Sequence, residues 1–302
     1  MIFDRLGELI HKTGNPTCAG LDTSLACLPP EFATQYDTST FVGAAQAILA
    51  YNRDLLEALA DIVPSVKVQI AYYEQYGAPG IQTFIDTIKL AKEAGLIVIA
   101  DAKRNDIAAT AGAYAAAFLG QTQLKDTKHP AFDADIVTVN PYLGTDGIEP
   151  FLQANPERGI FALVKTSNPS SSELQDMPLA DGRTVFEAVG DLVEQWGRGT
   201  EGESGYSCTG AVVGATHPAQ GAALRQRLEH TFFLLPGYGT QGATGADIAG
   251  MFDAHGGGAV VNASRSLLHA WQKSGKDHKT AAREAAIAMK EDISSALAGF
   301  AG

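Results

Sequence analysis

The chain has 302 residues, of which 45% are hydrophobic and 19% are charged. This composition is sufficient for a large buried core and excludes a disordered or fibrous protein. The formal net charge of -12 and the pI near 5.0 exclude nucleic acid and anionic membrane surfaces as expected partners, because a negative surface repels both. An anionic small-molecule substrate would need a local cluster of Lys and Arg.

The cysteine and histidine patterns contain no disulfide or metal signature. The cysteines, Cys18, Cys27 and Cys208, are odd in number and form no C-x-x-C pair, and no H-E-x-x-H occurs. We therefore expect reduced thiols and no bound metal. The N-terminal residues lack the apolar core of a signal peptide, and no apolar run reaches about 18 residues. These features predict a cytoplasmic protein that does not span a membrane.

Short apolar runs rich in Val and Ile alternate with Ala-rich helical stretches along the chain. Runs of this kind are typical of parallel strands that are buried on both faces. We expect strands at Thr17–Leu21, Ser65–Ile70, Leu96–Ala100, Ala134–Val139, Gly159–Val164, Gly210–Val213, Thr231–Leu235 and Gly258–Val261.

Helical stretches follow each of these runs, and several begin with Pro, Asp or Thr at the position of a helix start. We expect helices at Phe41–Val63, Pro79–Ala94, Ile107–Leu119, Asp146–Ala154, Thr184–Trp196, Pro218–Arg227, Asp247–Ala254 and Lys279–Leu297. Eight strand-helix units favour an α/β fold of the (β/α)8 TIM-barrel type over an open doubly wound sheet. We expect a single domain over 1–302, with longer loops at about 121–133 and 168–207.

The third run ends in alternating charges, in Asp101-Ala-Lys103-Arg-Asn-Asp106. If the strand continues, Asp101 and Lys103 lie on the same face, since side chains alternate along a strand. One interpretation is a surface ion pair at a strand end, which contributes little to stability. The other is a catalytic group, because a TIM barrel carries its active site at the C-terminal ends of its strands.

Two more charged residues lie at expected strand ends. Lys67 interrupts the apolar run Val66–Ile70, so its ammonium must either extend to the strand end or bind a carboxylate. Asp22 directly follows the first strand, where it would either cap the next turn or belong to the same site.

A glycine-rich segment, Gly237-Tyr-Gly-Thr-Gln-Gly242, follows the seventh strand and matches G-x-G-x-x-G. Three interpretations remain open, namely a dinucleotide fingerprint, a phosphate loop and a tight turn. The next strand ends in Asn262-Ala-Ser-Arg265 and not in the acidic residue that dinucleotide binding requires. Loops after strands 7 and 8 of a TIM barrel commonly bind phosphate, and Arg265 would add a bidentate contact.

Together these motifs resemble the orotidine 5'-phosphate decarboxylase family, in its longer bacterial form. Asp101-Ala-Lys103-Arg-Asn-Asp106-Ile107 resembles the D-x-K-x-x-D-I signature of that family, and the resemblance covers nearly the whole chain. Further matching segments are Gly20-Leu-Asp22, Lys67, Thr166-Ser167-Asn168, Pro236-Gly-Tyr-Gly-Thr-Gln241-Gly242 and Ala263-Ser-Arg265.

The resemblance implies a cofactor-independent carbon-carbon lyase that converts orotidine 5'-phosphate to uridine 5'-phosphate and CO2 in pyrimidine biosynthesis. It implies a catalytic network of Lys67, Asp101, Lys103 and Asp106, with Lys103 protonating C6. It also implies a homodimer in which Asp106, Ile107 and Thr110 reach the partner's site. The implied substrate-binding residues are Asp22 and Lys67 for the ribose, Ser167 or its neighbour Thr166 for the pyrimidine, Gln241 for base and phosphate, and Gly242 and Arg265 for the phosphate.

Two other functions remain to be distinguished. Metal-dependent sugar-phosphate enzymes of the same superfamily share D-x-K-x-x-D, but the resemblance places a magnesium carboxylate where Lys67 stands here. A non-catalytic barrel that senses a nucleotide is disfavoured by the full set of charges on the second and third strands. Fixed positive charge at Lys103 suits a decarboxylation that leaves an undelocalised carbanion.

Overall fold

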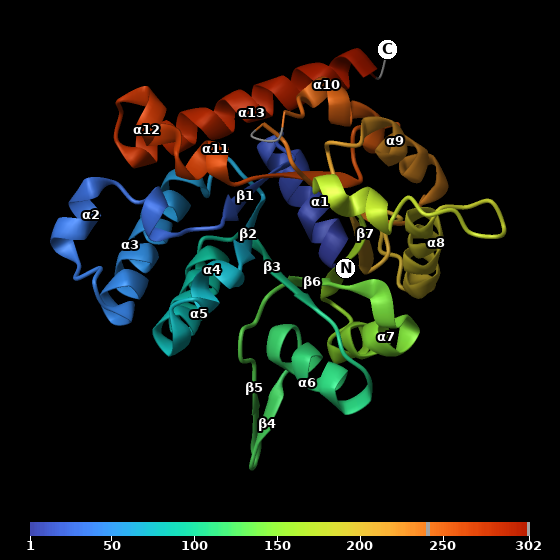
Figure 1. Cartoon of the computed structure of the whole chain (residues 1–302), viewed down its shortest axis with the longest axis horizontal. Coiled ribbons are helices and arrows are strands. Elements are labelled where there is room, and N and C mark those ends of the chain that lie inside the picture. Colours follow the sequence, from blue (N-terminus) through green and yellow to red (C-terminus); the bar gives the residue numbers. More distant parts are fainter. Residues whose placement is uncertain (240–241, 301–302) are drawn as a thin grey trace.

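The computed structural model describes residues 1–239 and 242–300, and in this part of the chain eight parallel strands close into a barrel surrounded by helices (Figure 1). The barrel closes where the first and last strands pair, with Thr17 opposite Val261. This confirms the predicted TIM barrel. The strands are β1 (Thr17–Leu21), β2 (Ser65–Gln69), β3 (Ile97–Arg104), β6 (Ile136–Val139), β7 (Gly159–Lys165), β8 (Thr209–Val213), β9 (Phe232–Pro236) and β10 (Ala259–Ala263).

Each strand matches a predicted run to within a few residues, because runs that are apolar on both faces fit only a doubly covered position. The interior and the helix-facing side of the sheet form two separate apolar clusters. Along β3, Ile97 and Ile99 point into the barrel, while Val98 and Ala100 pack against the helices. Strand β3 extends four residues beyond the predicted end and carries the charged residues with it.

The main helices also lie where the sequence predicts them. Thr40 accepts a hydrogen bond from the Gly43 amide at 3.0 Å at the start of α3, and Pro218 begins α9. The helices are α3 (Phe41–Leu59), α5 (Gly77–Glu93), α6 (Ala108–Phe118), α7 (Thr145–Ala154), α8 (Val185–Gly197), α9 (Pro218–Arg227) and α13 (His278–Phe300).

One predicted helix is wrong. In place of Asp247–Ala254 the chain forms a single turn, α10 (Gly245–Ile248), followed by the 3-10 turn η4 (Ala249–Met251). Gly250 and the glycines at 256–258 lower the helix propensity of this segment, so only short turns form. The predicted helix Phe41–Val63 ends early, at Leu59. Pro64 disfavours a helical conformation at Val63, so the helix does not reach its predicted end.

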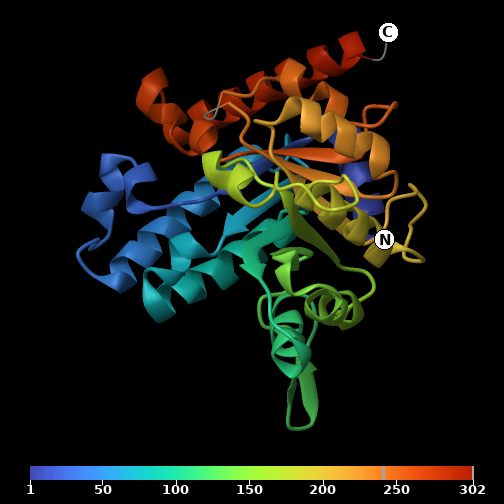
Figure 2. The same cartoon turned by 45° about the vertical axis from the view of Figure 1, so that its right-hand side comes forward.

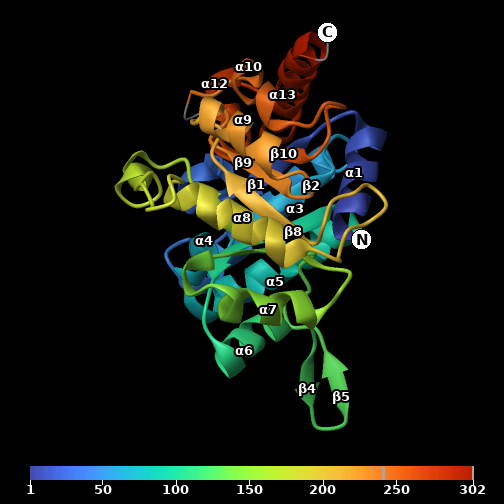
Figure 3. The same cartoon turned by 90° about the vertical axis from the view of Figure 1, so that its right-hand side faces the viewer.

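Helix α1 (Ile2–Thr13) was not predicted, and it closes the N-terminal end of the barrel (Figure 3). Its Ile2, Phe3 and Leu6 side chains are buried in the barrel interior. The Phe3 ring stacks on Phe232 with 4.9 Å between centroids and meets Phe161 edge-on at 5.3 Å. With this end filled by apolar side chains, polar chemistry is confined to the opposite end.

The remaining elements are short and lie in the connections. They are α2 (Pro30–Gln35), α4 (Ala71–Glu74), α11 (Arg265–Leu268), α12 (Ala270–Ser274), η1 (Leu25–Cys27), η2 (Pro141–Leu143) and η3 (Pro169–Glu173). Within the predicted loop 121–133, β4 (Thr122–Leu124) and β5 (Thr127–His129) form an exposed antiparallel hairpin that projects from the barrel (Figure 2). No helix in the described residues is long and apolar enough to cross a membrane.

Candidate active site

The C-terminal end of β3 is irregular, and this irregularity positions the two charged residues. The pairing of β3 with β6 shifts register between Ala100 and Arg104, and Lys103 adopts a positive φ of 48°. The hydroxyl of Thr138 on β6 accepts hydrogen bonds from the Ala102 and Lys103 amides, at 3.0 and 2.9 Å. Asp101 and Lys103 do share a face as predicted, but a bulge places them there and not simple strand alternation.

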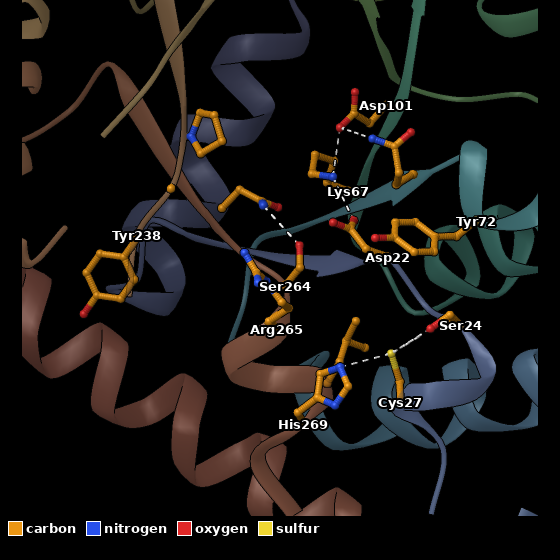
Figure 4. Close-up of a pocket in the computed structure, with 15 residues that line it drawn as sticks. Asp22, Ser24, Cys27, Lys67, Tyr72, Asp101, Tyr238, Ser264, Arg265 and His269 are labelled. Atoms are coloured by element: carbon orange, nitrogen blue, oxygen red, sulfur yellow. Dashed lines mark hydrogen bonds and ion pairs between the residues drawn. The ribbon is translucent and has the colours of Figure 1, made fainter. Parts of the chain in front are cut away.

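Four charged side chains form one continuous network across β1, β2 and β3 (Figure 4 shows Asp22, Lys67 and Asp101). The Lys67 ammonium lies 3.0 Å from Asp22 and 2.9 Å from Asp101. The other oxygen of Asp101 lies 2.6 Å from the Lys103 ammonium. Of the two interpretations of Lys67, the carboxylate-bound one is therefore correct, and the surface ion pair at Asp101 is excluded because Asp101 is only 7% exposed.

The network keeps its buried members charged. Burial raises the pKa of Asp101, but the nearby Lys67 and Lys103 outweigh this effect and hold the pKa of the carboxyl well below its usual range. Burial lowers the pKa of Lys67, while Asp101 and Asp22 outweigh it and raise that pKa. Of the two lysines in contact with Asp101, Lys103 is the more exposed, with 47% of its side chain accessible against 5% for Lys67.

Asp101 is also held by two neutral groups that sequence reasoning missed. Gln69 on β2 donates to one carboxylate oxygen at 2.8 Å, and Thr138 donates to the other at 2.9 Å. Both residues lie at or next to a strand end, but a neutral side chain there is a weaker signal than a charge in an apolar run. With these contacts both Asp101 oxygens have fixed partners, so the carboxylate has a defined orientation.

Asp106 does not join this network within its own chain. Its Oδ1 accepts a hydrogen bond from the Ile107 amide at 2.8 Å, and it forms no ion pair with any residue the structure describes. Ile107 is 53% exposed, and Thr110 is exposed in the first turn of α6. The structure therefore groups Asp106, Ile107 and Thr110 on one exposed surface beside the barrel mouth.

A cavity of about 360 Å³ opens on one side of the network, between the ends of β1, β9 and β10 (Figure 4). Its lining includes Asp22, Lys67 and Asp101 together with Gly237, Tyr238 and Arg265. Gly237 has a φ of 101°, a left-handed conformation that favours glycine. The loops after β9 and β10 thus meet at one cavity.

Of the residues predicted in the loop after β9, Gln241 lies outside the described residues. Gly242, the next residue in the sequence, is described and is exposed.

A second cavity, of about 410 Å³, opens on the other side of the same charges. It is lined by Lys67, Asp101 and Lys103 and by polar residues of the β7 end, including Thr166 and Ser167. Thr166 uses its hydroxyl within the protein, since it accepts from Gln175 at 2.7 Å and donates to Asn168 at 2.6 Å. Lys67 and Asp101 line both cavities, so the network stands on the border between them.

The first cavity contains further polar residues that sequence reasoning missed. His269 contacts the buried Cys27 with 3.4 Å between Nε2 and Sγ, and Asn262 donates to Ser264 at 3.3 Å. Cys27 and His269 follow β1 and β10 and fall outside the matching family motifs, so no sequence signal singles them out. Asn262 lies within β10, and Ser264 belongs to the matching segment Ala263-Ser-Arg265, but the sequence assigned neither of them a role. In the described residues no cluster of three or more His, Cys, Asp or Glu side chains could hold a metal ion.

The fold and this site define the class of the protein as a TIM-barrel enzyme with a charged active centre at the C-terminal ends of its strands. A family model described as "Orotidine 5'-phosphate decarboxylase / HUMPS family" matches residues 18–285. The chain belongs to this family and is an enzyme of the carbon-carbon lyase class.

Relatives of similar length are named orotidine 5'-phosphate decarboxylase. The chain is 39% identical to the orotidine 5'-phosphate decarboxylase of Clostridium acetobutylicum, over 98% of this chain and 100% of the relative. It is 39% identical to that of Rhodopirellula baltica, over 96% and 97% of the two chains. The crystal structure of a putative orotidine 5'-phosphate decarboxylase from Streptomyces avermitilis superposes with a TM-score of 0.79 at 32% identity, covering 98% and 96% of the chains.

Proposed function

We propose that this chain converts orotidine 5'-phosphate to uridine 5'-phosphate and CO2 without a cofactor or metal, with Lys103 as the proton donor to C6. The observation that carries the proposal is the network of Asp22, Lys67, Asp101 and Lys103 on the border of two cavities. A nucleotide that fills both cavities has its reacting carbon at this border. The names of the full-length relatives support the same substrate.

Electrostatics explain how the network would act on this substrate. Loss of CO2 from C6 leaves a carbanion, and a fixed positive charge stabilises it more than water does, because the charge needs no reorganisation. Lys103, whose ammonium lies 2.6 Å from Asp101, would supply that charge and would then transfer a proton to C6. Asp101 would orient the Lys103 ammonium, and Lys67 would hold Asp101 in place. The bond from C6 to the carboxylate carbon breaks, its electron pair remains on C6, and the Lys103 proton then forms the new C6–H bond.

The two cavities suit the two ends of the substrate. In the first cavity Arg265 would bind the phosphate, and Asp22 and Lys67 would hold the ribose. The family resemblance adds Gln241 and Gly242 as further residues for the phosphate. In the second cavity Ser167 would contact the pyrimidine. Ser167 is preferred to Thr166 because the Thr166 hydroxyl already bonds to Gln175 and Asn168.

A homodimer would complete the site. Asp106 forms no ion pair within the described chain, and three apolar residues near it are exposed. Ile107 is 53% exposed, and Tyr142 and Leu143 are 79% and 46% exposed. Gly147 lies against both Asp106 and Leu143, which places these residues on one surface. An apolar surface of this kind is typical of an interface, and across it Asp106, Ile107 and Thr110 would reach the partner's site.

The direct test is turnover of orotidine 5'-phosphate by the purified chain, followed as the loss of substrate absorbance with and without a chelator. We expect uridine 5'-phosphate and CO2 at the same rate in both conditions. Activity that disappears on chelation and returns with magnesium would instead support a metal-dependent sugar-phosphate enzyme. A folded dimer that does not turn over the substrate would contradict the proposal.

Arg265→Ala should weaken phosphate binding without removing the chemical step. Charge-assisted hydrogen bonds contribute about 1.5–3 kcal/mol, so KM should rise about 10- to 100-fold while kcat falls much less. Steady-state kinetics on the purified variant measure both values. Arg198→Ala, at the exposed end of α8, is the matched control and should leave KM unchanged. An unchanged KM in Arg265→Ala would remove Arg265 from the phosphate site.

A further inference from the structure

The hydroxyl of Ser264 lies in the wall of the first cavity and is not used to stabilise the fold. Ser264 occupies the position before the short turn α11, yet its side chain caps no backbone amide there. It accepts one hydrogen bond, from Asn262 at 3.3 Å, and no described residue accepts its proton. Its neighbour in sequence, Arg265, lines the same cavity (Figure 4).

Within the described residues, the side chain of Asn262 forms a hydrogen bond only with this hydroxyl. Asn262 is 7% exposed, and its Oδ1 has no hydrogen-bond partner in residues 1–239 or 242–300. A buried amide oxygen without a donor is unfavourable, and such groups occur where function requires them. The one hydrogen bond that the described chain gives this side chain is the donation from Nδ2 to Ser264. Because Asn262 donates, the Ser264 proton remains available to an acceptor in the cavity.

Gly20 on β1 provides the room for this arrangement. A Cβ atom at Gly20 would lie 1.9 Å from the Ser264 Oγ and 3.0 Å from the Asn262 Oδ1. Any other residue at position 20 would therefore displace the Ser264 hydroxyl. Gly20 pairs with Lys67 in the barrel, and the cavity that Ser264 lines is also lined by Lys67 and Asp101 of the charged network.

We propose that Ser264 is a further substrate-binding residue, which donates its hydroxyl proton to a phosphate oxygen of the bound nucleotide, and that Asn262 is the positioning residue that orients it. The inference rests on the proposed function. A hydroxyl whose oxygen already accepts a hydrogen bond presents its proton outward, and beside the Arg265 guanidinium the acceptor it meets is an anion. A nucleoside monophosphate gains this contact, and a nucleoside without phosphate does not.

The test compares the affinities of uridine 5'-phosphate and uridine, by calorimetry, in the purified 302-residue chain and its variants. Ser264→Ala should weaken uridine 5'-phosphate binding about 10-fold and change uridine binding less than about twofold. Asn262→Ala alone should lower the affinity for uridine 5'-phosphate about threefold. When it is added to Ser264→Ala, it should lower that affinity no further. Ser294→Ala, an exposed serine on α13, is the matched control and should change neither affinity.

Each alternative outcome is distinct. Equal weakening of both ligands by Ser264→Ala, or no weakening of either, would overturn the phosphate contact. A further loss from Asn262→Ala in the Ser264→Ala background would overturn the positioning role. The ratio of the two affinities is measured on one preparation, so partial unfolding of a variant does not change it. If the wild-type chain neither turns over orotidine 5'-phosphate nor binds uridine 5'-phosphate, the proposed function itself fails.

Discussion

Lys103→Ala should lower kcat at least about 10⁴-fold while leaving a folded protein. Proton donation by a placed general acid contributes about 10²- to 10⁴-fold, and a single electrostatic stabiliser contributes about 10²- to 10³-fold. Lys103 would supply both effects. The fold should persist because the Lys103 side chain is 47% exposed, and Asp101 keeps Lys67, Gln69 and Thr138 as partners. Single-turnover kinetics and thermal unfolding measure the two properties.

A chemical rescue gives this prediction its control. In Lys103→Cys, alkylation with a bromoethylamine restores an ammonium at nearly the original length. The natural cysteines, Cys18, Cys27 and Cys208, are buried, which favours reaction at position 103. Wild-type protein treated in parallel corrects for their modification. Recovery of turnover would support the ammonium as the active group, whereas near-normal turnover in Lys103→Ala would remove the proton-donor assignment.

Two inactive chains should regain activity when they are combined. If Asp106 serves the partner's site, a heterodimer of Lys103→Ala and Asp106→Ala chains has one site with both substitutions and one with neither. Its turnover should reach about half that of the wild-type dimer, while each homodimer stays inactive. This large recovery is expected because Asp106 forms no ion pair within its own described chain. Differently tagged, co-expressed chains allow the heterodimer to be purified before the assay.

The matched control combines Lys103→Ala with Asp101→Asn. Asp101 and Lys103 contact each other within one chain at 2.6 Å, so each site of this heterodimer carries one substitution. No recovery is expected there. A Lys103→Ala and Asp106→Ala heterodimer that is well formed but inactive would show that Asp106 serves its own subunit.

The sequence predicted those residues of the site that lie at the C-terminal ends of strands. Parallel strands that close into a barrel bring their C-terminal ends together, so Asp22, Lys67 and Asp101 were expected at one mouth, and they contact each other there. Gln69 and Thr138 also stand at strand ends, but neutral side chains carry no comparable signal. Their role depends on distances across the barrel that no local pattern contains.

The sequence by itself determined the barrel. Eight continuous apolar runs that alternate with helical stretches are compatible with few other architectures. The sequence also placed Asp22, Lys67 and Asp101 at strand ends, and the structure then showed that they contact each other. Only the tertiary structure decided how Lys103 meets Asp101, since the bulge at the end of β3 depends on hydrogen bonds to Thr138 of a different strand. Only the tertiary structure revealed that α1 closes the other end of the barrel and that Gly20 leaves room for Asn262 and Ser264, because these contacts join residues far apart in the chain.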